Sequence, residues 1–275
     1  MLWASASVAT KLGLLSAQPL IIANTRFFIA GFLMLLGAHV LRKYRLPERD
    51  EWQPLLIYGL LNVTIYLGLY IVSMQELSAG VGSLSVALNP LMISILSAFW
   101  MQRAVKRNEW AGLTLGIIGV AIVVYPLLLA SYVTMKGIIL MLLSLLAYSV
   151  GTVYYSSRTW RLPTLAINGW QVLFGGICLL PFTFTLTDFS ANHYDARFWY
   201  SVGWLVFVSI AAVQMWLYLL KIDTIKASLW LYLCPTFGFI YAKILMDEPI
   251  TLFTVAGTLL VILGLYIGQK KKIEN

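Results

Sequence analysis

The stretch from Cys234 to Gly264 reads CPTFGFIYAKILMDEPITLFTVAGTLLVILG. It predicts an apolar helix that contains Pro235 and ends at an acidic pair, followed by a second apolar helix that contains Gly257 and Gly264. The same spacing of one proline and two glycines occurs once before, at Pro90, Gly112 and Gly119. Each of these residues lies 145 positions ahead of its counterpart. A constant offset through two helices and a loop indicates a duplicated unit.

The composition places the chain in a membrane. Of its 275 residues, 60% are apolar and only 11% are charged, and the mean hydropathy is +0.84. A soluble domain needs far more charge to cover its surface, and its helices are not apolar on all sides. The net charge of +8 comes from basic residues between apolar runs, which is typical of membrane topology and not of nucleic-acid binding. Cys178 and Cys234 lie within apolar runs, which favours packing over a disulfide.

A membrane-spanning helix needs roughly 20 mostly apolar residues, and the chain offers ten candidates. They are residues 1–15, 19–41, 53–73, 79–101, 110–129, 137–157, 164–186, 198–219, 224–246 and 250–268. The first is short, and its partner at the 145 offset begins at a position that corresponds to one before Met1. We expect that roughly one third of this helix lies outside the sequence, since a full span needs about 20 residues. It lacks the basic start and cleavage site of a signal peptide.

The basic residues predict how the chain is oriented. Most lysines and arginines, 14 of 19, lie in the C-terminal tail and in the loops that follow the second, fourth, sixth and eighth candidates. They are Arg42, Lys43, Arg45, Arg49, Arg103, Lys106, Arg107, Arg158, Arg161, Lys221, Lys226, Lys270, Lys271 and Lys272. The opposite side holds four: Lys11, Lys136, Arg197 and Lys243. Because lysine and arginine collect on the cytoplasmic side, both termini are predicted to be cytoplasmic.

The duplication predicts the architecture: an all-α integral membrane protein of ten helices in two repeats. The first repeat covers residues 1–130, the second covers 137–269, and 270–275 form a basic cytoplasmic tail. Five helices per repeat is an odd number, so the second copy is inverted relative to the first. Inverted repeats are typical of secondary transporters, in which two bundles rock about a site near the membrane midplane.

Several motifs add a family resemblance that covers nearly the whole chain. They are LWASASVATK at Leu2–Lys11, the pair Arg26-Phe27, and the set Pro235, Glu248, Gly257 and Gly264. In this combination the chain resembles the drug/metabolite transporter superfamily, EamA type. The resemblance implies a small-solute exporter in a bacterial inner membrane, with a cavity lined mainly by the third, fourth, eighth and ninth helices. Amino acids or other metabolites are its implied substrates.

At the end of the fourth helix, Arg103 occupies the position equivalent to Glu248. Because this end is predicted to be cytoplasmic, arginine suits it as a topological signal. We expect Glu248, beside Pro249, to cap the start of the last helix and not to touch substrate.

Arg26 is the charged residue predicted to lie inside a span, roughly 10 Å from the start of its helix at 1.5 Å per residue. Buried charges in membranes are usually functional, and a guanidinium suits a carboxylate such as that of an amino acid. The alternative is that Arg26 extends to the interface or caps a helix end. Its counterpart at the 145 offset is Gln171, next to Trp170, and we expect both to form a polar rim near the cavity mouth.

A second set of polar and aromatic residues is predicted to line the cavity. Helix spacing places Asn62, Tyr66 and Tyr70 on one face. The other helices contribute Asn89, Gln214, Trp230 and Tyr232. Aromatic rings with hydroxyls would stack on and hydrogen-bond amphipathic solutes. The alternative, strongest for Tyr70, is an aromatic belt at the membrane interface.

Proline and glycine predict how the helices bend and pack. Pro90 and Pro235 lie near the middle of the fourth and ninth helices. We expect them to act either as hinges for alternating access or as static kinks. Gly112-x-x-x-Gly116 and Gly264-x-x-x-Gly268 predict close helix packing within the chain, with a weak homodimer as the alternative to a monomer.

The sequence offers no catalytic, metal or cofactor motif. It lacks a P-loop, and all eleven acidic residues fall in loops or at helix ends. We therefore expect a facilitator or an exchanger driven by solute gradients. Alternative substrates are nucleosides, sugars or drugs, although cationic drugs would need a buried carboxylate. The alternatives outside transport are a membrane-embedded enzyme, for which the spans lack a nucleophile–base set, and a receptor.

Overall fold

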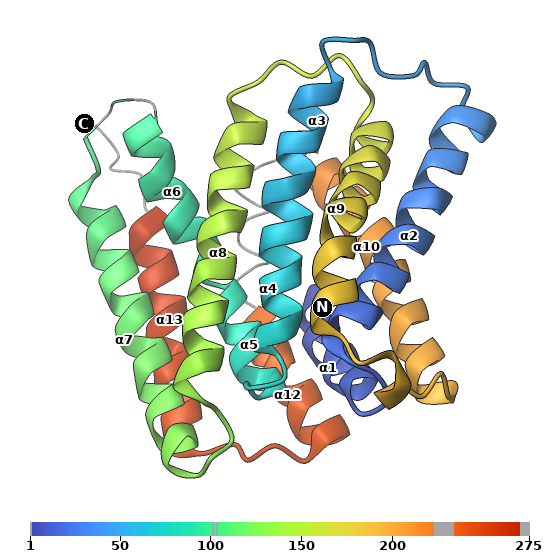
Figure 1. Ribbon diagram of the computed structural model, residues 1–275. Helices are drawn as coiled ribbons and strands as arrows, with labels where there is room; N and C mark the ends of the chain where they lie inside the picture. The colour runs from blue at the N-terminus through green and yellow to red at the C-terminus, as the bar shows by residue number, and fades with distance from the viewer. Residues whose placement is uncertain (1, 101, 103, 223–233, 270–275) are drawn as a thin grey trace.

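The computed structural model describes residues 2–100, 102, 104–222 and 234–269, and all regular elements of this part of the chain are helical (Figure 1). Of residues 213, 214, 216–222 and 269 only the backbone path is described. The helices run along one common direction, and their connections lie at the two ends of the bundle.

The first half of the chain contains several interrupted helices. Its elements are α1 (Leu2–Leu14), α2 (Pro19–Leu35), η1 (Leu36–Leu41), α3 (Trp52–Gly59), η2 (Leu60–Ile65), α4 (Tyr66–Ser73), α5 (Ala79–Val86), α6 (Asn89–Trp100) and α7 (Arg107–Leu129). Both η1 and η2 are π-helical segments within longer helices. The helix α2 continues directly into η1, and α3, η2 and α4 follow one another as one continuous helix.

The second half has longer uninterrupted helices. They are α8 (Met135–Ser156), α9 (Thr164–Leu186), the 3-10 turn η3 (Phe189–Ala191), α10 (Ala196–Ile222), α12 (Cys234–Met246) and α13 (Leu252–Gln269). All of these elements fall within or beside segments that the hydropathy pattern predicted.

Six helical stretches of the described chain are long and apolar enough to cross a membrane. They are Pro19–Leu41, Trp52–Ser73, Ala79–Trp100, Arg107–Leu129, Met135–Ser156 and Thr164–Leu186. Shorter apolar helices cover Ala196–Ala212, Cys234–Met246 and Leu252–Gly268. The chain is therefore a multi-pass membrane protein, and the predicted total of ten spans stays a prediction.

The helices α7 and α13 cross in close contact. A Cβ atom added at Gly119 would lie 2.6 Å from the carbonyl oxygen of Gly257, and one at Gly112 would lie 2.6 Å from that of Gly264. Only glycine allows backbones to approach so closely. The close packing within one chain that was predicted for Gly112 and Gly264 is confirmed, and Gly119 and Gly257 extend the same contact.

The helix that contains Pro90 is interrupted, as its sequence predicted. The α-helix α5 ends at Val86, and α6 begins at Asn89 after a turn at Ala87 and Leu88. Proline has no N–H to continue the hydrogen-bond ladder, so the chain turns just before it. Pro235 is the second residue of α12. The hinge roles of both prolines stay predictions.

The predicted role of Glu248 is wrong. Its carboxylate accepts hydrogen bonds from the backbone N–H groups of Ala79 at 2.5 Å and Gly80 at 3.0 Å, which begin α5. The first turn of a helix leaves N–H groups without partners and carries partial positive charge, which a carboxylate satisfies. Glu248 therefore caps a helix 168 positions away in sequence and not the helix that follows Pro249.

Candidate functional site

The polar centre of the bundle is built on the π-helical segment η2. In η2, Asn62 donates from Nδ2 to Oε1 of Gln171 at 3.0 Å, and Thr64 donates from Oγ1 to the carbonyl of Gly175 at 2.9 Å. Gln171 in turn donates from Nε2 to Oδ1 of Asn168 at 2.5 Å. These bonds attach η2 to α9, and π-helical segments are frequent at functional sites.

The two tyrosines that follow Asn62 contact other helices. The ring of Tyr66 lies 4.6 Å from that of Tyr148 on α8, centroid to centroid, and 6.2 Å from that of Tyr70. The hydroxyl of Tyr70 and that of Ser7 on α1 are 2.9 Å apart, and Ser83 of α5 donates to Ser7 at 2.9 Å. Tyr70 is 6% exposed, so it lies in the interior of the bundle.

We call these residues the polar line. Hydrogen bonds join Asn168, Gln171 and Asn62 at one end of it and Tyr70, Ser7 and Ser83 at the other, and the ring of Tyr66 lies between the two groups in sequence and beside the ring of Tyr70. The three residues that helical spacing placed on one face are close in space, but their side chains contact α9, α8 and α1 in turn. One reason is the wider turn of η2, which shifts the direction of side chains relative to an α-helix.

Arg26 lies beside this line. It donates from Nε to Oγ of Ser209 on α10 at 2.8 Å, and its guanidinium carbon is 5.7 Å from the ring centroid of Phe27. The hydroxyls of Tyr66 and Tyr70 are near enough to interact with its charge. No carboxylate among the described residues pairs with it. An arginine inside a span therefore retains a charge that a solute anion can match.

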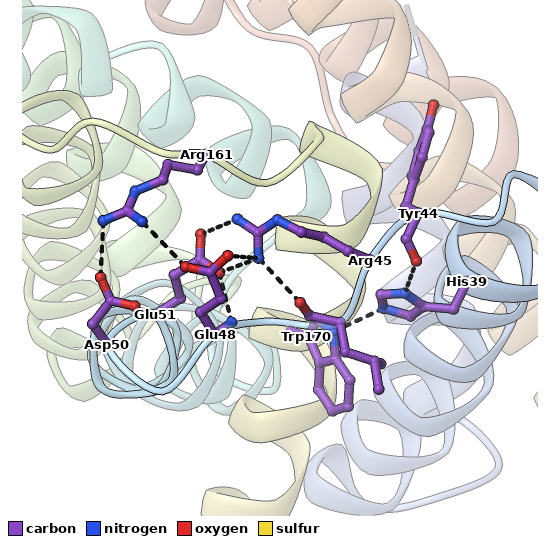
Figure 2. A network of polar contacts seen from close by, with 9 residues as sticks. His39, Tyr44, Arg45, Glu48, Asp50, Glu51, Arg161 and Trp170 are labelled. Carbon is purple, nitrogen blue, oxygen red and sulfur yellow. Dashed lines mark hydrogen bonds and ion pairs between the residues drawn. The ribbon is translucent and has the colours of Figure 1, made fainter.

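Trp170 contacts other residues than Gln171 does, and its predicted place at the cavity mouth stays a prediction. Its indole N–H donates to Nε2 of His39 at 3.0 Å (Figure 2). Its ring lies 4.8 Å from that of Trp52. Nδ1 of His39 is 2.9 Å from the carbonyl oxygen of Tyr44, so the proton of the neutral ring lies on Nδ1. Adjacent residues of a helix point about 100° apart, which separates Trp170 from Gln171.

The same end of the bundle carries a network of ion pairs (Figure 2). Arg45 holds both carboxylate oxygens of Glu51, at 2.6 and 2.9 Å, and Arg161 reaches Glu48 at 3.1 Å and Asp50 at 3.0 Å. The hydrogen bonds from Arg45 lower the pKa of the Glu51 carboxyl below its ordinary value. The network joins the loop of residues 42–51 to that of 157–163, and we call this end of the bundle the basic end.

The structure describes only some of the remaining predicted site residues. Asn89 is buried at the start of α6, and its Oδ1 lacks a hydrogen-bond partner among the described residues. The side chain of Gln214, together with Trp230 and Tyr232, lies outside the described residues. The expected cavity wall from the eighth and ninth helices is therefore untested.

The sequence analysis did not single out five residues of this centre: Ser7, Ser83, Tyr148, Asn168 and Ser209. One signal could have found Ser209, because it lies 145 positions after Thr64, as Gln171 lies 145 after Arg26. Gln171, the counterpart of Arg26, accepts a hydrogen bond from Asn62, two residues before Thr64, while Thr64 itself donates to the carbonyl of Gly175.

Two cavities open at opposite ends of the bundle. One, of about 510 Å³, lies at the basic end, and we call it the polar cavity; it is lined by Asp50, Glu51, Pro54, Trp100, Tyr154, Ser157, Arg158, Thr159, Trp160 and Arg161. The other, of about 660 Å³, is mostly apolar and lies between α1, α10 and α12. Among the described residues no cluster of His, Cys, Asp and Glu could hold a metal ion.

Comparisons with known proteins agree on one family. The profile described as the EamA-like transporter family matches residues 1–125 and again 135–267. The chain is 27% identical to uncharacterized transporter YvbV of Bacillus subtilis, with all of this chain and 90% of that protein covered. It is 27% identical to a probable amino-acid metabolite efflux pump of Salmonella typhimurium, over 98% of this chain and 91% of that one. A solved crystal structure shares the fold with a TM-score of 0.64 at 17% identity, covering 98% of this chain and 93% of that one.

Proposed function

The chain belongs to the EamA-like transporter family, and on that premise we propose that it exports a small solute with a carboxylate, an amino acid or a derivative, across the bacterial inner membrane. The observation that carries the choice of solute is Arg26. Its guanidinium lies inside a predicted span, is held by Ser209 and has no carboxylate partner among the described residues. A solute carboxylate would complete its pairing.

The helix contacts support alternating access through two inverted repeats. With the 145 offset, α8 is the counterpart of α1, while α4 and α6 are the counterparts of α10 and α12. The structure packs α1 on α10 and α12, and it packs α8 on α4 and α6. The pairs α2–α9 and α7–α13 join counterparts directly. Two related bundles of this kind can exchange conformations about a shared central site.

The alternatives have weaker support. A cationic drug would need a buried carboxylate near the centre, but the buried glutamates of the described chain, Glu51 and Glu109, lie at helix starts. Nucleosides or sugars would use the polar line without needing Arg26. A receptor or membrane-embedded enzyme would leave the duplicated helix contacts without a role.

Counterflow in proteoliposomes tests the proposal. Vesicles are preloaded with single unlabelled amino acids, and entry of the labelled solute is followed. We expect counterflow for at least one amino acid and a reduction of about tenfold in Arg26→Gln, because a charge-assisted hydrogen bond contributes roughly 1.5–3 kcal/mol.

The matched control is Arg42→Gln, which removes the same charge from an exposed position at the basic end. If Arg26→Gln leaves counterflow unchanged, the protein is a transporter but Arg26 does not bind the solute. Absence of counterflow over the whole panel, with nucleosides and sugars transported instead, would overturn the choice of solute.

A further inference from the structure

The polar cavity at the basic end has one positive charge without a partner. Two carboxylates and two guanidiniums line it. Asp50 pairs with Arg161, and Glu51 pairs with Arg45, which lies outside the lining. Arg158 forms no ion pair with any described residue; its guanidinium carbon lies 4.9 Å from the ring centroid of Tyr154.

Tyr154 supplies a second unsatisfied group in the same cavity. Its side chain is buried, at 9% exposure, yet its hydroxyl has no hydrogen-bond partner among the described residues. A buried hydroxyl without a partner costs free energy that a ligand can recover by bonding to it. The indole rings of Trp100 and Trp160 complete the lining with apolar surface.

Comparison with the apolar cavity shows that the fold does not require these polar groups. At the 145 offset, Tyr154, Ser157 and Trp100 correspond to Ala9, Leu12 and Leu245, and all three of these line the apolar cavity at the other end. The two cavities therefore occupy equivalent places, and each is lined by an unequal set of polar groups. The apolar cavity contains Arg197 and the buried Ser201, whose hydroxyl already donates to the carbonyl of Ala9 at 2.6 Å, whereas the buried hydroxyl of Tyr154 has no partner among the described residues. Packing alone does not account for the difference.

We propose that the polar cavity is a binding vestibule for a soluble monoanion with an apolar body, in which Arg158 binds the carboxylate and Tyr154 donates a hydrogen bond to it. Its volume of about 510 Å³ is within the range of small-molecule sites. The inference rests on the proposed function: the vestibule would receive the solute at the basic end, and Arg26 would bind it further inside.

Isothermal titration of the full chain in phosphatidylcholine nanodiscs tests the vestibule without requiring transport. The probe is 3-phenylpropionate, and its amide is the uncharged match. All variants carry Arg26→Gln, so that binding at Arg26 does not contribute. We expect the acid to bind more tightly than the amide, and Arg158→Gln to weaken binding of the acid about tenfold. Arg158→Lys should restore part of this loss, and Tyr154→Phe should cost about threefold.

The charge control is Arg42→Gln, which should leave binding unchanged. Equal binding of acid and amide, or binding that Arg158→Gln does not weaken, would overturn the proposal. Loss of probe binding when phosphatidylglycerol is added to the nanodisc would assign the cavity to a lipid headgroup and also overturn it. If counterflow occurs but the probe does not bind, the proposal of export stands and that of the vestibule is rejected. If the probe binds but no counterflow occurs, the vestibule stands and export is rejected.

Discussion

At the scale of single residues, two charged side chains carry most of the interpretation. Arg26 is held by Ser209 within the bundle, and Glu248 binds two backbone N–H groups at the start of α5. Each charge acts on a helix that is distant in sequence. The first supports recognition of an anion, and the second joins the loop before α13 to the start of α5.

Glu248→Ala should destabilise the protein by about 1–2 kcal/mol, because it leaves two N–H groups of α5 without their carboxylate. Glu248→Gln should cost less, since its amide oxygen still accepts one bond. Thermal unfolding in detergent measures both.

Asp247→Asn is the matched control for this prediction. Asp247 has a positive φ of 53°, a conformation that asparagine tolerates, and its ion pair with Lys243 is exposed. If Glu248→Ala has the melting temperature of the wild type, the cap contributes no stability.

At the scale of elements, the structure depends on close backbone contact and on local departures from the α-helix. The π-helical η2 lies against α9, where a Cβ added at Gly59 would be 2.6 Å from the carbonyl oxygen of Gln171. The glycines of α7 and α13 allow an equally close crossing. Small residues thus decide which helices meet, because in lipid no hydrophobic force draws helices together.

Gly119→Ala should destabilise the bundle by about 1–3 kcal/mol, since the added methyl would overlap the backbone of α13. Gly203→Ala is the control: it lies in α10 with no atom within 4 Å of the added Cβ. Alanine there should be neutral or slightly stabilising, because it favours the helix. Thermal unfolding of both variants gives the comparison, and equal melting temperatures would contradict the importance of the α7–α13 crossing.

At the scale of the whole molecule, the loops of residues 42–51 and 187–195 lie at opposite ends of the bundle (Figure 1). The first contains four lysines and arginines, and the second contains two aspartates and neither lysine nor arginine. The positive-inside rule therefore predicts that the basic end, with the polar cavity, faces the cytoplasm. An exporter would meet its solute on that side.

Cysteine labelling tests this orientation. With Cys178 and Cys234 replaced by alanine, Arg49→Cys should react with an impermeant maleimide only after the cells are opened. His193→Cys should react in intact cells, because it is exposed in the opposite loop. The reverse pattern would place the polar cavity outside, and both proposals would then describe uptake instead of export.

The sequence by itself determined the class of the protein and most helix positions, because hydropathy and helix-breaking residues act locally. It also predicted that the glycines of α7 and α13 pack closely within the chain, although it did not identify these two helices as each other's partners. It singled out Arg26, Asn62 and Gln171, because polar residues are rare in spans.

Only the tertiary structure decided which of these residues meet. Sequence proximity placed Trp170 beside Gln171 and assigned Glu248 to the helix that follows it. In the bundle Trp170 bonds His39, and Glu248 caps α5. The polar cavity was likewise not visible in the sequence, because its walls come from two loops, residues 42–51 and 157–163, and from α3, α6 and α8. The physical reason is that hydrogen bonds and ion pairs join helices distant in sequence, and their partners are fixed by packing geometry and not by local pattern.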